Sequence, residues 1–141
     1  MNEKIIINNQ ELMALVKEQI NNKNVTLTIK GNSMLPFFRD GRTIITLEKP
    51  KKLKRLDVVL FKYNDIYILH RIIKIKEKIV TQGDGLISKE IIDESDVVAV
   101  VKFFEKNRKL TFSNNKFYLF KVRMWRILRP FRRVLLKLVK K

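Results

Sequence analysis

Two residues of this 141-residue sequence, Ser33 and His70, have types and settings suited to nucleophilic catalysis. Ser33 lies in the segment GNSMLP over residues 31–36, directly after a run of β-forming residues, so a loop is expected to expose its hydroxyl. A serine hydroxyl is a weak nucleophile near neutral pH and needs a base that takes its proton. His70 is the only histidine, and an imidazole ordinarily titrates at about pH 6.5, so it is a competent base.

Each residue of this pair also has an ordinary structural interpretation. A serine after glycine and asparagine is common in turns, and a histidine among isoleucines is common in a core. The segment around His70 alternates, so on a strand His70 shares one face with Ile68 and Ile72 while Arg71 points to the other face.

A carboxylate is needed to orient the imidazole and to stabilise its protonated form. Asp84 is the preferred residue because it lies in the turn GDG at residues 83–85, shortly after the histidine strand and its expected hairpin partner. Asp40 and Asp57 remain alternatives. The catalytic residues expected from the sequence are therefore Ser33, His70 and Asp84.

The pattern of apolar residues predicts a mainly β fold, a barrel or a sandwich, preceded by one short amphipathic helix over residues 9–23. Strands are expected at 25–29, 43–47, 58–63, 66–75, 79–81 and 97–104. These elements divide the chain into a helical segment (1–24), a β-domain (25–105) that would contain Ser33, His70 and Asp84, and a basic tail (106–141).

Composition excludes several classes of protein. The sequence has no cysteine and a single histidine, which excludes disulfide frameworks, thiolate metal sites, cysteine nucleophiles and multi-histidine metal centres. No cofactor or metal is therefore expected. No run reaches the roughly 18–20 uncharged apolar residues of a membrane-spanning helix, and the amino terminus lacks the apolar region of a secretory signal.

The net charge of +17 lies mostly in the tail. Glu105 is the last acidic residue, and thirteen lysines and arginines follow it. Residues 116–141 predict an amphipathic helix, which Pro130 is expected to kink. Its apolar face is expected to contain Met124, Ile127, Leu128, Phe131, Val134, Leu135 and Leu138, and its basic face Arg126, Arg129, Arg133, Lys137 and Lys140.

Three partners suit such a tail. An anionic membrane surface would accept the apolar face at the acyl boundary and the basic residues at the head groups, with Trp125 and Phe131 at the interface. Alternatively, the apolar face packs on the β-domain or on another protein. Nucleic acid is the least favoured because the sequence has no nucleic-acid-binding motif. The expected location is peripheral to the cytoplasmic membrane, or else the cytoplasm.

Four short motifs in a fixed order resemble the signal peptidase I superfamily, which includes the self-cleaving LexA-type repressors. They are Gly31-x-Ser33-Met34-x-Pro36, Asp57-Val58-Val59-Leu60-Phe61, His70-Arg71-Ile72-Ile73 and Thr81-Gln82-Gly83-Asp84. His70 stands where the bacterial enzymes have lysine, so the sequence is most similar to the endoplasmic-reticulum and archaeal type. The resemblance implies a serine endopeptidase with a peptide or protein substrate, a leader or signal-like segment. It also implies that Ser33 attacks the peptide carbonyl of the substrate and that the Ser33 backbone N–H stabilises the oxyanion. By the same resemblance, the Asp84 carboxylate supports the imidazole of His70.

The sequence departs from that pattern in places. Gly31 stands where many bacterial members have a hydroxyl residue, and Leu56 stands where the family often has glycine. The amino-terminal membrane anchor of signal peptidases is not expected from residues 1–8. The alternative function is a binding module without activity, with a peptidase-like fold and a tail that recruits a membrane or partner. A self-cleaving repressor is disfavoured, because about thirty residues precede the serine motif and no lysine replaces His70.

Overall fold

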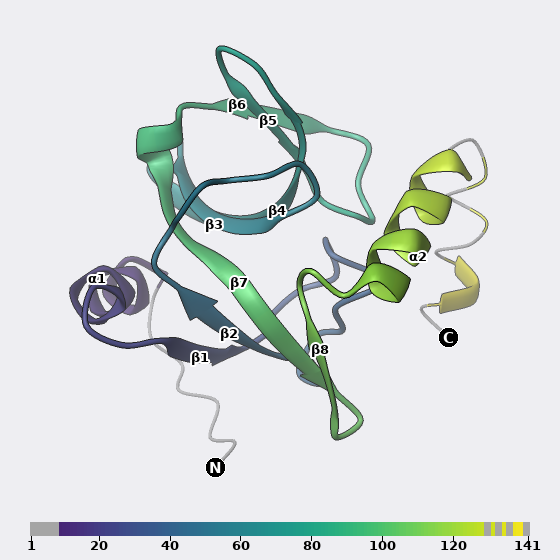
Figure 1. Ribbon diagram of the computed structural model, residues 1–141, viewed down its shortest axis with the longest axis horizontal. Helices are drawn as coiled ribbons and strands as arrows, with labels where there is room; N and C mark the ends of the chain where they lie inside the picture. Colours follow the sequence, from purple (N-terminus) through teal and green to yellow (C-terminus); the bar gives the residue numbers. More distant parts are fainter. Residues whose placement is uncertain (1–8, 129–130, 132–133, 135–136, 140–141) are drawn as a thin grey trace.

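A computed structural model describes residues 9–128, 131, 134 and 137–139 and shows a mainly β fold built around one antiparallel sheet (Figure 1). The sheet has eight strands, and two longer helices flank it. In chain order the elements are α1 (Asn9–Ile20), β1 (Val25–Thr28), β2 (Ile44–Glu48), β3 (Val58–Tyr63), β4 (Ile66–Ile75), β5 (Ile79–Gln82), β6 (Lys89–Ile92), η1 (Glu94–Asp96), β7 (Val97–Lys106), β8 (Lys109–Phe112) and α2 (Lys116–Ile127). The expected fold class and the six expected strands are confirmed, and β6 and β8 are additions.

The order of the strands brings distant parts of the sequence together. It runs β1-β2-β7-β3-β4-β5-β6, and β8 pairs with β7 off this path. The long strand β7 pairs with β3 through its first residues and with β2 through its later ones. The sheet also continues past the expected boundary at residue 105, because β8 lies in the segment expected to be tail.

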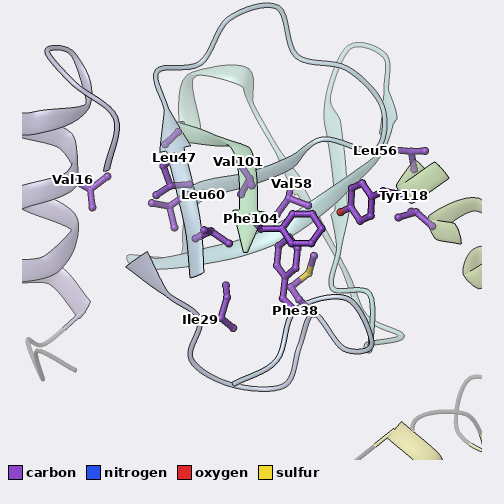
Figure 2. Close-up of a cluster of buried hydrophobic side chains, with 14 of the residues drawn as sticks. Val16, Ile29, Phe38, Leu47, Leu56, Val58, Leu60, Val101, Phe104 and Tyr118 are labelled. Carbon is purple, nitrogen blue, oxygen red and sulfur yellow. The ribbon is translucent and has the colours of Figure 1, made fainter. Parts of the chain in front are cut away.

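The curved sheet buries side chains on both faces, which explains the unbroken apolar run at the start of β3. Val58 and Leu60 enter the larger core cluster, whereas Val59 and Phe61 enter a smaller cluster on the other face. Figure 2 shows the larger cluster, in which the ring of Phe104 lies 4.8 Å from that of Phe38 (centroid to centroid). A strand buried on both sides has no polar face, so periodicity alone indicates only that it is buried.

The two helices pack at opposite ends of the sheet (Figure 1). Helix α1 buries Val16 and Ile20 against the larger cluster and ends at Ile20, where a turn begins. Helix α2 begins after Asn115, whose side-chain oxygen accepts a hydrogen bond from the backbone N–H of Tyr118 at 2.9 Å. This contact satisfies a donor that the helix itself leaves unpaired. No helix within the described residues is both long enough and apolar enough to cross a bilayer.

The residues of α2 that pack on the sheet lie outside the apolar face expected from the sequence, so the alternative in which that face packs on the β-domain is wrong for its described members. Tyr118, Val122 and Trp125 are the buried residues of α2, so the expectation that Trp125 lies at a membrane interface is wrong. The described members of the expected apolar face are exposed instead: Met124, Ile127, Leu128, Phe131, Val134 and Leu138. Arg129, Pro130, Arg133, Leu135 and Lys140, named above, lie outside the described residues.

Candidate active site

Ser33 lies in the loop between β1 and β2, which is anchored by buried side chains directly after the serine. Met34, Leu35 and Phe38 are almost fully buried, whereas Ser33 itself is partly exposed. Gly31 begins the turn with a positive φ of 87°, which glycine adopts without steric cost, and its N–H donates to an Asp40 oxygen at 2.8 Å. The loop therefore presents the serine hydroxyl from a fixed backbone.

His70 lies in β4 on the face expected from strand alternation. Its ring is buried and meets the ring of Phe61 edge-on, with the centroids 6.3 Å apart. Arg71 lies on the opposite face, beside the rings of Phe37 and Tyr118. The prediction that the side chains of His70 and Arg71 point to opposite faces of the sheet is thus confirmed.

A buried carboxylate binds the imidazole. His70 Nδ1 lies 2.7 Å from Glu90 Oε1, and the Thr81 hydroxyl donates to the same oxygen at 2.8 Å. Glu90 is buried and comes from β6, whose register places it opposite Thr81 of β5. A carboxylate only accepts hydrogen bonds, so this contact puts a proton on Nδ1 and leaves Nε2 as the ring atom that accepts one.

Gly83 marks the place where the serine loop meets the histidine. A Cβ built on Gly83 would lie 2.6 Å from the Ser33 carbonyl oxygen and 2.9 Å from His70 Nε2. These two atoms are therefore separated by no more than the sum of the two distances, about 5.5 Å. The Gly85 N–H also donates to the Ser33 oxygen at 2.9 Å, which ties the two loops together. Ser33 and His70, 37 positions apart in the sequence, are brought to one place.

The expected contact between Asp84 and His70 is wrong. Both oxygens of Asp84 accept hydrogen bonds from Arg71, at 2.8 Å each, on the other face of the sheet. Asp57 accepts from the backbone N–H of Lys54, and Asp40 accepts from Gly31 as described above. Asp84 still lies next to the site, because it directly follows Gly83 in the loop that contacts Ser33.

The pair of Arg71 and Asp84 forms the centre of a buried polar network. Arg71 also donates to the Leu56 carbonyl at 2.9 Å and to the Tyr118 hydroxyl at 2.7 Å, while the Trp125 indole donates to the Asp84 carbonyl at 2.6 Å. Burial alone would lower the pKa of the Arg71 guanidinium, but the charge of Asp84 raises it above its ordinary value. Burial raises the pKa of the Tyr118 hydroxyl. The network fixes the loop that carries Gly83 to the sheet and to α2.

Leu56 occupies the position where members of the signal peptidase I superfamily often have glycine. Its φ is 79°, in the left-handed region that favours glycine, and its side chain is buried in the larger cluster. Its N–H donates to the Ile72 carbonyl at 2.8 Å. Leu56 therefore adopts the left-handed backbone conformation that glycine would favour. Burial of the leucine side chain offsets the strain of that conformation.

Glu90 is the residue that the sequence analysis missed. The segment Lys89-Glu90-Ile91-Ile92 is short and half charged, so it gave no clear strand signal. Its alternation nevertheless places Glu90 on the same face as the buried Ile92. The sequence feature that points to Glu90 is a glutamate on the same face as an apolar residue, in a short strand after the GDG turn.

The chain matches the model of one known protein family. The model of the family described as Peptidase S24-like matches residues 2–82, more than half of the chain. The matched region contains Ser33, His70 and Arg71 and ends one residue before Gly83. No curated protein sequence matches the chain significantly. On the match and on the eight-stranded antiparallel sheet, this chain belongs to the Peptidase S24-like family.

Proposed function

We propose that the protein is a serine endopeptidase in which Ser33 is the nucleophile, His70 the general base and Glu90 the carboxylate that orients His70. The observation that carries the proposal is that the Ser33 carbonyl oxygen and His70 Nε2 lie within about 5.5 Å of each other at Gly83, while Nδ1 binds Glu90 on the far side of the ring. A hydroxyl, an imidazole and a carboxylate in this order form the constellation of serine hydrolases on many unrelated folds.

The chemistry follows from the positions of the protons. His70 Nε2 takes the hydroxyl proton as the Ser33 oxygen bonds to the peptide carbonyl carbon, and Glu90 stabilises the imidazolium that forms. The proton then passes to the departing amine as the C–N bond breaks, which leaves an acyl-enzyme on Ser33. A water molecule deprotonated by His70 hydrolyses that ester. The backbone N–H of Ser33 is the proposed donor to the oxyanion, a contribution that is large in such reactions.

Arg71 and Asp84 act as positioning residues in this proposal. They do not touch His70 through any described hydrogen bond, but they fix the Gly83–Gly85 loop against the sheet. The close approach at Gly83 leaves no room for a side chain, so a shift of this loop moves the Ser33 backbone relative to the imidazole.

The proposed substrate is a leader or signal-like peptide bound in extended conformation. This part rests on the resemblance of His70-Arg71 and Gly83-Asp84 to the endoplasmic-reticulum and archaeal signal peptidases. By the same resemblance, small residues are expected on the amino-terminal side of the cleaved bond.

Digestion of a peptide library, followed by mass spectrometry of the products, tests the activity. Ser33→Ala and His70→Ala should each abolish cleavage, whereas the matched control Ser95→Ala, an exposed serine in η1, should cleave like the unmodified protein. Full cleavage by either site variant contradicts the proposal. If the unmodified protein cleaves no peptide and Ser33 reacts with no serine-directed probe, the chain is a binding module with a peptidase-like fold.

A further inference from the structure

Helix α2 has two apolar faces, and the sheet covers only one. Tyr118, Val122 and Trp125, spaced four and three residues apart, are the buried face. Phe117, Phe120, Met124 and Ile127 have the same helical spacing on the other side and are exposed, from 40% of the Met124 surface to 70% of the Ile127 surface. Large apolar side chains exposed together indicate an interaction site.

Exposed apolar residues also follow α2 in the sequence, and exposed basic residues flank the apolar ones on the helix. Phe131, Val134 and Leu138 are each more than half exposed. Lys116, Lys121 and Arg123 are exposed residues of α2 itself, and the Lys121 ammonium lies 4.6 Å from the centre of the Phe117 ring. The sequence contains no acidic residue after Glu105.

Charge decides which partner suits this surface. A second copy would bring two chains of net charge +17 together along their most basic segments, which repel one another. A nucleic acid would satisfy the lysines and arginines, but it would leave a row of phenylalanine and isoleucine side chains against phosphates and water. An anionic bilayer satisfies both features, because apolar side chains enter the acyl boundary while cations meet the head groups.

We propose that the exposed face of α2, formed by Phe117, Phe120, Met124 and Ile127, binds the surface of an anionic lipid bilayer, with the helix axis in the plane of the interface. The buried face of the same helix contacts the site described above. The Trp125 indole donates to the Asp84 carbonyl, and the Arg126 guanidinium donates to Gln82 at 3.2 Å. Binding would therefore leave the Gly83–Gly85 loop on the side of α2 that faces away from the bilayer, about one helix diameter (roughly 10 Å) from it.

Co-sedimentation with phosphatidylglycerol vesicles tests the inference on the full chain. The double variant Phe117→Ser, Phe120→Ser should bind at least about tenfold more weakly, since two large apolar side chains leave the interface. The matched control Ile66→Ser removes a similarly exposed apolar side chain at the start of β4 and should bind like the unmodified protein. Deletion of residues 116–141 is unsuitable, because it also removes Tyr118, Val122 and Trp125 from the core.

Four further measurements separate the bilayer from the other partners. Phosphatidylcholine vesicles should bind at least about tenfold less protein than phosphatidylglycerol vesicles, and salt should weaken the anionic binding. Undiminished binding by the double variant would overturn the proposal. A dimer in solution that the double variant abolishes would also overturn it, and so would binding to DNA that depends on both phenylalanines. These measurements need no peptidase activity, so they fail or succeed independently of the proposed function.

Discussion

Replacement of Glu90 by glutamine removes the charge that faces His70 while keeping the shape of the side chain. The two interacting atoms, Nδ1 of His70 and Oε1 of Glu90, are 2.7 Å apart, and both side chains are buried. When His70 takes the serine proton, two unit charges at this distance attract by about 6 kcal/mol in an effective dielectric of about 20. The glutamine oxygen still accepts hydrogen bonds, so we expect a net loss of about 2 to 4 kcal/mol in the transition state, or roughly 30- to 900-fold in rate.

The rate at which a fluorophosphonate probe labels Ser33 measures this effect without a known substrate. Glu94→Gln, at an exposed glutamate in η1, is the matched control and should label at the unmodified rate. Thermal unfolding of both variants shows whether Glu90→Gln has folded. A folded Glu90→Gln protein that labels within about twofold of the unmodified rate would refute the role assigned to Glu90, since about twofold is only about 0.4 kcal/mol.

Three further predictions concern the surroundings of the pair. Gly83→Ala should reduce labelling of Ser33 by more than about tenfold, since its Cβ would meet the Ser33 carbonyl oxygen and His70 Nε2; unchanged labelling would contradict the close approach. Asp84→Asn should lower the free energy of unfolding by about 3 to 5 kcal/mol in urea titrations, because Arg71 keeps a buried charge without its partner; a loss below about 1 kcal/mol would contradict this. Burial raises the pKa of Tyr118, so the unfolded chain releases this proton first as pH rises above about 10, and stability falls there. Tyr118→Phe should therefore lose less stability than the unmodified protein between pH 9 and pH 11, as compared by urea unfolding, and an equal loss would contradict the assignment.

The sequence predicted the fold class and the two faces of β4 because both depend on local patterns. Alternation along residues 66–75 separated His70 from Arg71, and apolar runs bounded by turn residues located six strands. The partner of His70 depends on register between β5 and β6, which no local pattern fixes. Asp84 was closer in sequence and lay in a turn, but the buried guanidinium of Arg71 binds both of its oxygens.

The face that α2 buries could not be predicted from the helical pattern alone. A helix with apolar residues on two sides has no unique inward face, and the helical pattern predicts only that the widest apolar side forms one amphipathic stripe. The loop that carries Asp84 settles the choice, because its backbone carbonyl accepts the Trp125 indole hydrogen and Arg71 binds the Tyr118 hydroxyl. Polar tips on Tyr118 and Trp125 therefore decide which aromatic residues face the sheet.

Mapping the residue that a fluorophosphonate probe modifies tests the central claim most directly. We expect a single adduct, on the peptide that contains Ser33, and its loss in His70→Ala, because the hydroxyl reacts only when the imidazole takes its proton. An adduct on another serine, or an equal yield at Ser33 in a folded His70→Ala protein, would contradict the claim that these two side chains act together.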